Sequence, residues 1–370
     1  MIRLFKHMAQ MLAVTAAMLL SGCQYGSILS DLHNAEQSSD SLAICFHNGV
    51  IENPVNTRAV TLLSDHLNTM GVWGWQTTSD GLVERIFLDQ EITFNPALHR
   101  WTYSPVKYWE NKSTYRFHAY APHSSTSPGV KVEIDSVKGY INIIGVTLKG
   151  CNNVSTDTIT PGIFSHVDDI DWMIDRTTQN LQGKNHTDVT FNMQHILSKL
   201  CIKVKNNSTS LLQDSTMFMT LDSLHVGTFI SQGNFGQKYT QAPTPDDSTQ
   251  YRFETSEWTP VDTLPRYILR SHDGLPVTDS CVCIIESLLI PQPTVEGQMI
   301  DIWYTLGVKN GLASHFHYAK PLKDVFGGFV SSCNYVIEIS VGPDIITFDS
   351  GMTGWENSYN TSFTKQESKQ

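Results

Sequence analysis

Cys23 is the residue near the start of the chain whose setting points most directly to a chemical reaction. Residues 11–20 form an apolar run with basic residues in front of it, and Leu20-Ser21-Gly22-Cys23 ends the run. A bilayer span takes about 20 apolar residues, so this run is too short for one and is typical of a secretion signal. The four closing residues match a lipobox, in which the cysteine is acylated after cleavage.

We therefore predict that residues 1–22 are a lipoprotein signal peptide and that Cys23 is the lipidation site, carrying palmitate or a similar acyl group. An ordinary secretion signal followed by an incidental cysteine is the alternative. Gln24 comes next, where an Asp would be the usual signal for retention in the inner membrane. The pattern thus favours an outer-membrane lipoprotein precursor at the cell surface, since several acyl chains make a stable anchor.

The other cysteines can form disulfides, because an exported protein meets an oxidising compartment. Six cysteines allow fifteen pairings, and the sequence does not choose among them. Buried, unpaired thiols are the alternative for each. The spacing contains no CxxC, which disfavours a zinc ribbon, and Cys281 and Cys283 share one strand face, where they cannot easily bond each other. The six are Cys45, Cys151, Cys201, Cys281, Cys283 and Cys333.

Catalytic patterns are missing from the sequence. It has no G-x-S-x-G, H-E-x-x-H or phosphate-binding glycine loop, so we predict no enzyme and no cofactor. His315 and His317 share a face of a predicted strand and could begin a metal site, but no third ligand is evident, so we predict no metal. A group of large aromatic residues could stack on a glycan or could fill a core. That group is Trp73, Trp75, Trp101, Tyr103, Tyr108 and Trp109.

The elements that must position these residues are strands. The chain has 370 residues, 40% of them hydrophobic and only 16% charged, with a net charge of −11, which excludes a disordered chain and disfavours a nucleic-acid binder. Short period-2 patterns separated by turn signals recur, as at residues 115–120 and 335–341. An all-β fold of sandwiches follows.

The strand patterns fall into two series, separated by a polar stretch at residues 176–187 that resembles a linker. The predicted organisation is a leader at 23–58 and two tandem β-sandwiches at 59–185 and 186–370. Within the second series the apolar phase slips by one residue at Gln194-His195, which predicts a β-bulge there.

The leader holds two further features. Leu42, Ile44 and Phe46 alternate with Ala43 and Cys45, so both faces of this first strand could be buried. No Lys or Arg separates Lys6 from Arg58, so a trypsin-like protease would find one site between the lipid and the body of the protein.

Several segments, in this order, resemble the fimbrillin family of Bacteroidetes type V pili, and the resemblance extends from Cys23 to about Trp355. The segments are the lipobox, Thr57-Arg58-Ala59, the run from Trp101 to Trp109, the run from Tyr115 to Pro122, and the run from Val189 to Leu200, which is similar to the family's His-x-Leu-Ser-Lys strand.

The resemblance implies two transthyretin-like sandwiches and cleavage after Arg58, so that the assembled form begins at Ala59. Removing the first strand would open an apolar groove for a strand from a neighbouring fimbrial subunit. Leu42, Ile44 and Phe46 would be the plug strand that fills this groove before assembly.

The expected partners are other fimbrial subunits, the outer membrane through the lipid on Cys23, and a receptor on a host or bacterial surface. Residues 356–370 carry only two large apolar side chains, Tyr359 and Phe363, at a spacing that fits no strand face, so the sequence favours a tip or accessory subunit over the main stalk. The alternative function is a stand-alone surface lipoprotein that binds glycan through exposed aromatic residues.

Replacing the lipidated thiol tests the anchor. Cys23→Ser should release the protein from the membrane fraction, because the variant has no sulfur to acylate. The measurement is cell fractionation combined with labelling by a palmitate analogue. A variant that stays in membranes and still takes up the label would contradict the assignment.

Overall fold

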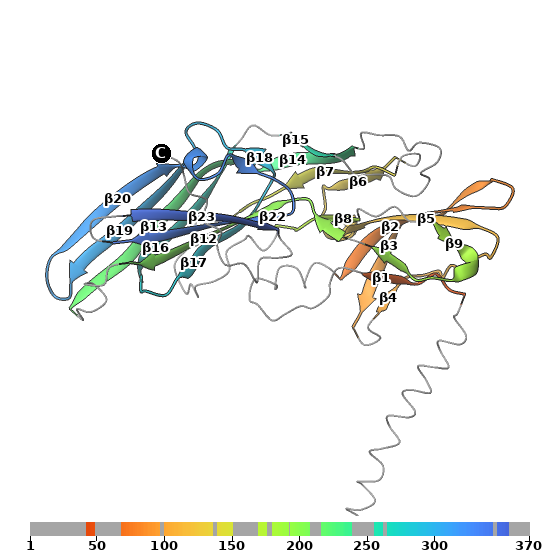
Figure 1. Ribbon diagram of the computed structural model, residues 1–370, viewed down its shortest axis with the longest axis horizontal. Helices are drawn as coiled ribbons and strands as arrows, with labels where there is room; N and C mark the ends of the chain where they lie inside the picture. Colours follow the sequence, from red (N-terminus) through yellow and green to blue (C-terminus); the bar gives the residue numbers. More distant parts are fainter. Residues whose placement is uncertain are drawn as a thin grey trace, which may run out of the picture.

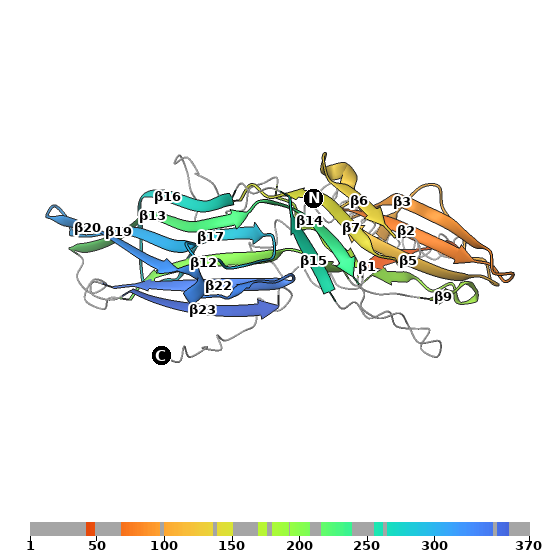
Figure 2. The ribbon, with the colours of Figure 1, turned by 90° about the horizontal axis from the view of Figure 1, so that it is seen from above.

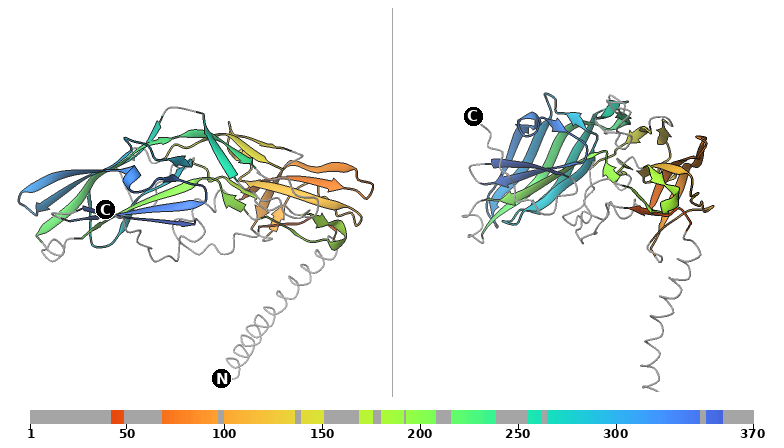
Figure 3. Two further views of the ribbon diagram at one scale, coloured as in Figure 1. Left: turned by 45° about the horizontal axis from the view of Figure 1, so that its top comes forward. Right: turned by 45° about the vertical axis from the view of Figure 1, so that its right-hand side comes forward.

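A computed structural model shows two β-rich lobes that follow one another along the long axis of the molecule (Figures 1 and 3). None of the helices in the described part of the chain has the length and apolar character needed to cross a membrane. Cys23, Arg58, Ala59 and the segment after Gly354 lie outside the described residues. The described residues are 42–48, 68–96, 100–135, 139–150, 169–175, 180–191, 193–207, 216–238, 255–261, 265–342 and 346–354.

The C-terminal lobe is a sandwich of two four-stranded sheets, and its core is built from the inward residues of both. All pairings in these sheets are antiparallel except that of β12 with β22, which is parallel. One sheet has the order β17 (Val282–Leu289), β12 (Ser198–Asn206), β22 (Cys333–Val341) and β23 (Ile346–Gly354). The other has the order β16 (Pro265–Pro276), β13 (Met217–Ile230), β19 (Met299–Val308) and β20 (Ala313–Pro321).

The N-terminal lobe has three layers. Its central sheet is seven-stranded, with the order β11 (Met193–His195), β8 (Met173–Asp175), β5 (Thr114–Ala121), β2 (Thr69–Thr77), β3 (Val83–Asn95) and β4 (Arg100–Thr102), and with β9 (Leu181–Gln182) paired to β5. One face is covered by the sheet β15 (Thr255–Pro260), β14 (Gln232–Lys238), β7 (Ile141–Thr147) and β6 (Lys131–Ile134). The other face is covered by β1 (Phe46–Asn48) and β10 (Val189–Phe191).

Five short elements complete the described part of the chain. They are the pair β18 (Gln292–Pro293) and β21 (Gly328–Phe329), and the 3-10 turns η1 (Ser124–Thr126), η2 (Gly183–Asn185) and η3 (Leu322–Asp324).

The three-layer arrangement explains why the central strands are apolar on both faces. In β5, Tyr115 and Phe117 belong to the core under β1, whereas Tyr120 belongs to the core under β7 and β14. In β2, Val72 faces the first core and Trp73 the second. Period-2 alternation therefore sorts large side chains between two cores rather than between a core and solvent. The all-β prediction is confirmed by these sheets.

Sheet pairing crosses the domain boundary predicted at 185/186. β10, β11, β14 and β15 follow that position in the chain, yet all four pair within the N-terminal lobe, and Gln232 of β14 faces Thr147 of β7. Figure 2 shows β14 and β15 beside β7. The polar stretch read as a linker contributes β9, which pairs with β5. The prediction of two separate, consecutive sandwiches missed this exchange of strands, because patterns within strands do not reveal which strands pair.

The predicted bulge at Gln194-His195 is wrong. The run from Val189 to Asn206 is divided among β10, β11 and β12, which lie in three different sheets. Ile196 and Leu197 form a bend between β11 and β12, and both are fully buried in the core that includes Leu288 and Ile290 of the other lobe. The phase slip therefore marks the passage of the chain from one lobe to the other.

The predicted glycan platform is mostly core. Trp73, Trp75 and Trp109 are buried, and Trp101 and Tyr103 are half-buried against the core under β1. Tyr108 is exposed. A sugar cannot stack on rings that other side chains already cover, so this group does not support the alternative of glycan binding through exposed aromatic residues.

His118 should make the protein sensitive to acid. Burial, aided by the Arg116 charge, lowers the pKa of His118 to about 3. The unfolded chain protonates this group near pH 6.5 and the folded protein does not, so stability should fall as the pH drops through the range between these values. From pH 7 to pH 4.5 the loss of stability is about 2.5 kcal/mol.

The measurement is urea unfolding of the wild type and His118→Leu at both pH values. The variant should lose about 2.5 kcal/mol less than the wild type over this interval. His315→Gln, at an exposed side chain, is the control and should behave as the wild type. Equal losses in the wild type and His118→Leu would refute the assignment.

Candidate functional site: the N-terminal strand

The described segment 42–48 is held between two other segments of the N-terminal lobe. On one side Ala43 bridges Tyr108 in the antiparallel sense. On the other side β1 pairs with β10 in the parallel sense, with Phe46 opposite Val189. The segment is thus the middle of three neighbouring extended chains, although it comes from a different part of the sequence (Figure 1).

Backbone hydrogen bonds hold the segment on both sides. The Ile44 N–H donates to the Lys107 carbonyl at 2.9 Å, and the Trp109 N–H donates to the Leu42 carbonyl at 2.8 Å. Across the other edge, the Val189 N–H donates to the Cys45 carbonyl at 2.8 Å. These bonds are independent of the side chains of segment 42–48, so another extended chain could make the same ones.

The Phe46 ring is the largest side chain that the segment inserts into the lobe. It is 2% exposed, and its centroid lies 5.4 Å from that of Phe87, 5.5 Å from Tyr103, 5.7 Å from Phe117 and 5.8 Å from Phe191. Three of these contacts are edge-on and the fourth is stacked, which are the favourable geometries for aromatic pairs.

Ile44 adds a second apolar anchor. Its side chain is 1% exposed and belongs to the same core as Phe46. Full burial of such a side chain contributes about 1.5–3 kcal/mol, so the two together contribute about 3–6 kcal/mol. The Tyr103 hydroxyl donates to the Ile44 carbonyl at 2.8 Å, which satisfies a backbone group inside the site.

Leu42 does not share this environment. Its side chain is 46% exposed, although the sequence placed it on the same face as Ile44 and Phe46. The regular β1 strand begins only at Phe46, and Ala43 makes an isolated bridge, so strict alternation does not extend to Leu42. Of the three proposed plug residues, the structure brings Ile44 and Phe46 together in the core and leaves Leu42 at its edge.

The flanking segment at residues 103–110 was not recognised from the sequence as part of this site. The Glu110 N–H donates to the Tyr115 hydroxyl at 2.7 Å, and Trp109 packs edge-on against Tyr115 at 4.7 Å. Burial raises the pKa of Tyr115, so its hydroxyl stays neutral. The aromatic spacing was visible in the sequence, but nothing there indicated that these rings pack around the leader.

Chemically, the site is suited to an extended apolar peptide. Without segment 42–48, the core formed by Met70, Val72, Phe87 and Phe117 would lose its cover, and the Trp109 and Val189 N–H groups would lose their acceptors. Exposed apolar side chains beside unpaired backbone groups are the features that bind an added strand.

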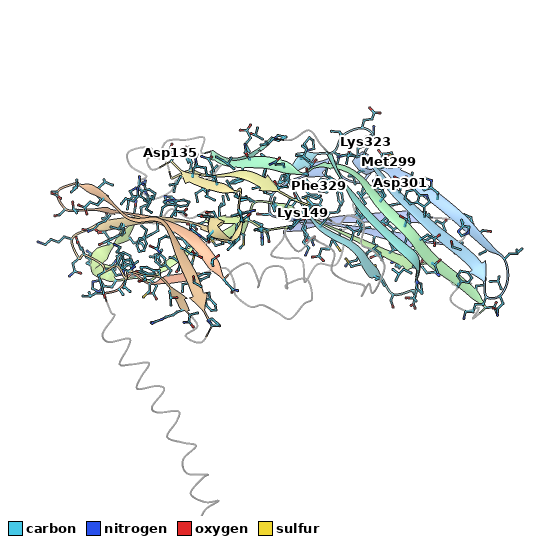
Figure 4. All side chains as sticks on the ribbon, turned by 180° about the vertical axis from the view of Figure 1, so that it is seen from behind. Asp135, Lys149, Met299, Asp301, Lys323 and Phe329 are labelled. Carbon is cyan, nitrogen blue, oxygen red and sulfur yellow. The ribbon has the colours of Figure 1, made fainter. Side chains whose placement is uncertain are left out.

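The two histidines considered as metal ligands lie in the other lobe and pair with different carboxylates. His317 Nε2 is 2.9 Å from Asp301 Oδ1, and the His317 ring stacks on Trp303. His315 Nδ1 lies 3.7 Å from Asp222 Oδ2. Asp301 is on β19, in the lobe remote from β1 (Figure 4). His315 also hydrogen-bonds Thr305 Oγ1 at 2.7 Å, directly across from it on β19, so the two imidazoles have different nearest partners.

Comparison with known proteins identifies related sequences and folds. A family model described as fimbrillin-like matches residues 57–355. None of the curated proteins is significantly similar to the chain. A solved fimbrial protein from Bacteroides vulgatus has 17% sequence identity and a TM-score of 0.56, and the match covers 85% of this chain and 99% of that one.

Two further solved structures align over similar lengths but less closely. A candidate cell adhesion protein from Bacteroides uniformis has 16% identity and a TM-score of 0.46, with 85% of this chain and 97% of that chain covered. The tip fimbrial protein Mfa3 from Porphyromonas gingivalis has 8% identity and a TM-score of 0.29, with 85% and 99% covered.

Truncating the buried ring tests the energetic role of segment 42–48. Phe46→Ala should destabilise the uncut protein by about 3–5 kcal/mol, because it leaves a cavity among four aromatic rings. Leu42→Ala, on the same segment but exposed, is the matched control and should change stability by about 0.5 kcal/mol or less. Urea unfolding measures both. Equal effects of the two substitutions would mean that the segment does not contribute to the core.

Proposed function

We propose that this chain, which belongs to the fimbrillin-like family, is a structural and adhesive subunit of a cell-surface fimbrium that assembles by strand exchange. The observation that carries the proposal is the double pairing of segment 42–48, with Phe46 enclosed in the N-terminal core. A neighbouring subunit would supply a strand that takes the place of this segment.

The covalent connectivity suits a removable strand. β1 ends at Asn48 and β2 begins at Thr69, and Arg58 lies between them in the sequence. A cut after Arg58 would leave β1 attached to its lobe by non-covalent contacts only. The family model begins to match at residue 57, beside this position, which supports an assembled form that starts at Ala59.

Export and anchoring precede this step in the proposal. The signal peptide and Cys23 would deliver the precursor to the outer membrane, where the plug strand keeps the apolar core covered. Cleavage would cut the covalent link from the body to both the lipid anchor and the plug, since both lie in residues 23–58. Displacement of the plug by an incoming strand would then also free the body from the membrane.

Energetics permit replacement of the plug. Ile44 and Phe46 contribute about 3–6 kcal/mol through burial, and the segment spans few residues. A donor strand that extends beyond residues 42–48 would add backbone hydrogen bonds and apolar contacts to those it replaces. The exchange is then favourable because the incoming strand makes more hydrogen bonds and buries more apolar surface than the segment it replaces.

The position within the fimbrium is proposed as tip or accessory. Residues 356–370 offer no alternating apolar face to a neighbouring groove, whereas segment 42–48 lies in a groove that could accept one. A subunit that accepts a strand but offers a poor donor suits the end of a fibre better than its stalk.

Blocking cleavage tests the assembly step. Arg58→Ala should leave the leader attached and exclude the protein from fimbriae, because the plug stays tethered at high effective concentration. Arg85→Ala, in β3, is a matched loss of one arginine that should not affect processing. Purified fimbriae are analysed by N-terminal sequencing and immunoblotting. Normal incorporation of uncut Arg58→Ala protein would overturn the proposal.

A further inference from the structure

Two cysteines from distant parts of the sequence meet on neighbouring strands of the C-terminal lobe. Cys201 lies in β12 and Cys283 in β17, which pair antiparallel (Figure 2). Their Sγ atoms are 3.3 Å apart. Cys201 is buried and Cys283 half-buried, so the two thiols face each other in a largely enclosed place.

The contact follows the geometry of the ladder. Cys201 is directly opposite Glu286, and Cys283 is directly opposite Lys203, so the cysteines are diagonal neighbours. The register shifts between Ile202 and Lys203, at the step that separates them. Lys199 forms an ion pair with Glu286 along the same diagonal, which shows that the twist of this strand pair brings such positions into contact.

A metal ion is the competing use of these residues. Cys201, Cys283 and Glu286 each offer a ligand atom, and these atoms lie within 4.8 Å of one another. However, the Glu286 carboxylate is already paired with the Lys199 ammonium, and Lys203 acts electrostatically on both cysteines. Two lysines beside the sulfurs disfavour a divalent cation and favour the thiolate that thiol–disulfide exchange requires.

We propose that Cys201 and Cys283 form a disulfide bond, closing a covalent ring between β12 and β17. The oxidant is a disulfide donor of the thiol–disulfide exchange class. One cysteine, as its thiolate, attacks the donor disulfide and releases one donor thiol. The other cysteine then attacks the mixed disulfide and releases the second. The protein loses two protons and two electrons, and the donor is reduced to two thiols.

The electrostatics identify the thiolate. The hydrogen bond between the two thiols lowers the pKa of Cys201, with support from Lys203 and Lys199, although burial and the Glu286 charge oppose the shift. The same pairing raises the pKa of Cys283. Cys201 is therefore the thiol of the pair that ionises more readily, which suits it to attack the donor disulfide.

The disulfide would close a covalent ring that contains strands of both lobes. The chain between Cys201 and Cys283 contains β13, β14, β15 and β16. β13 and β16 are in the C-terminal lobe, whereas β14 and β15 extend the sheet that covers the N-terminal lobe. A disulfide that closes such a long loop reduces the conformational entropy of the unfolded chain. This reduction is larger for long loops than for short ones.

Oxidation in vitro tests the proposal on the full chain. The purified protein is equilibrated with mixtures of oxidised and reduced glutathione, alkylated, digested without reduction and analysed by mass spectrometry. With oxidised glutathione in excess, the peptides that contain Cys201 and Cys283 should be linked. Cys333→Ser is the control and should leave this link intact. Cys201→Ser should leave Cys283 open to alkylation.

Stability provides a second readout. Reducing the oxidised wild type should lower its melting temperature by about 5–10 °C, and the same treatment should not shift Cys201→Ser/Cys283→Ser. Alkylation of both thiols under all glutathione ratios would overturn the proposal. A link from Cys283 to another cysteine, or stoichiometric zinc on the pair with both thiols reduced, would overturn it as well.

Discussion

The structure of the N-terminal lobe depends on covering a central sheet that is apolar on both faces. β2 and β5 carry large apolar side chains on each side, so neither face can be left to solvent without exposing a core. The sheet that contains β7 and β14 covers one face through Ile143, Val146 and Phe235. The other face has a much smaller cover, of which Ile44 and Phe46 are part.

The two covers differ in how they are attached. In the first cover, β14 and β15 lie between β13 and β16 of the C-terminal lobe in the sequence, and β6 and β7 lie between β5 and β8 of the central sheet, so every strand of this cover is connected to the body at both ends. β1 precedes the central sheet in the sequence and is connected to it only through residues 49–68, which include Arg58. Removal of a short strand can therefore uncover one core and leave the other intact, and this asymmetry suits a site that exchanges strands.

The sequence predicted strand patterns well, because alternation is a local property of a few neighbouring residues. The burial of Ile44 and Phe46, and the alternation of Tyr115, Phe117 and Tyr120, agree with it. Local alternation could not predict the exposure of Leu42 or the burial of Trp109, since both depend on which distant segments of the chain lie beside these residues. For the same reason the sequence left all pairings of the cysteines open, and only the register of β12 and β17 brings Cys201 to Cys283.

The path of the chain after the plug site connects the two lobes. β10 pairs with β1, β11 joins the edge of the central sheet, and β12 lies between β17 and β22 in the C-terminal lobe. Between β11 and β12, Ile196 and Leu197 are buried beside Leu288 and Ile290, so the connection is packed. A strand that replaces β1 would bind against β10, only a few residues from this packed bend. The strand β10, which lies beside β1, is thus only a few residues from the bend at Ile196 and Leu197, whose packing against Leu288 and Ile290 ties this part of the N-terminal lobe to the C-terminal lobe.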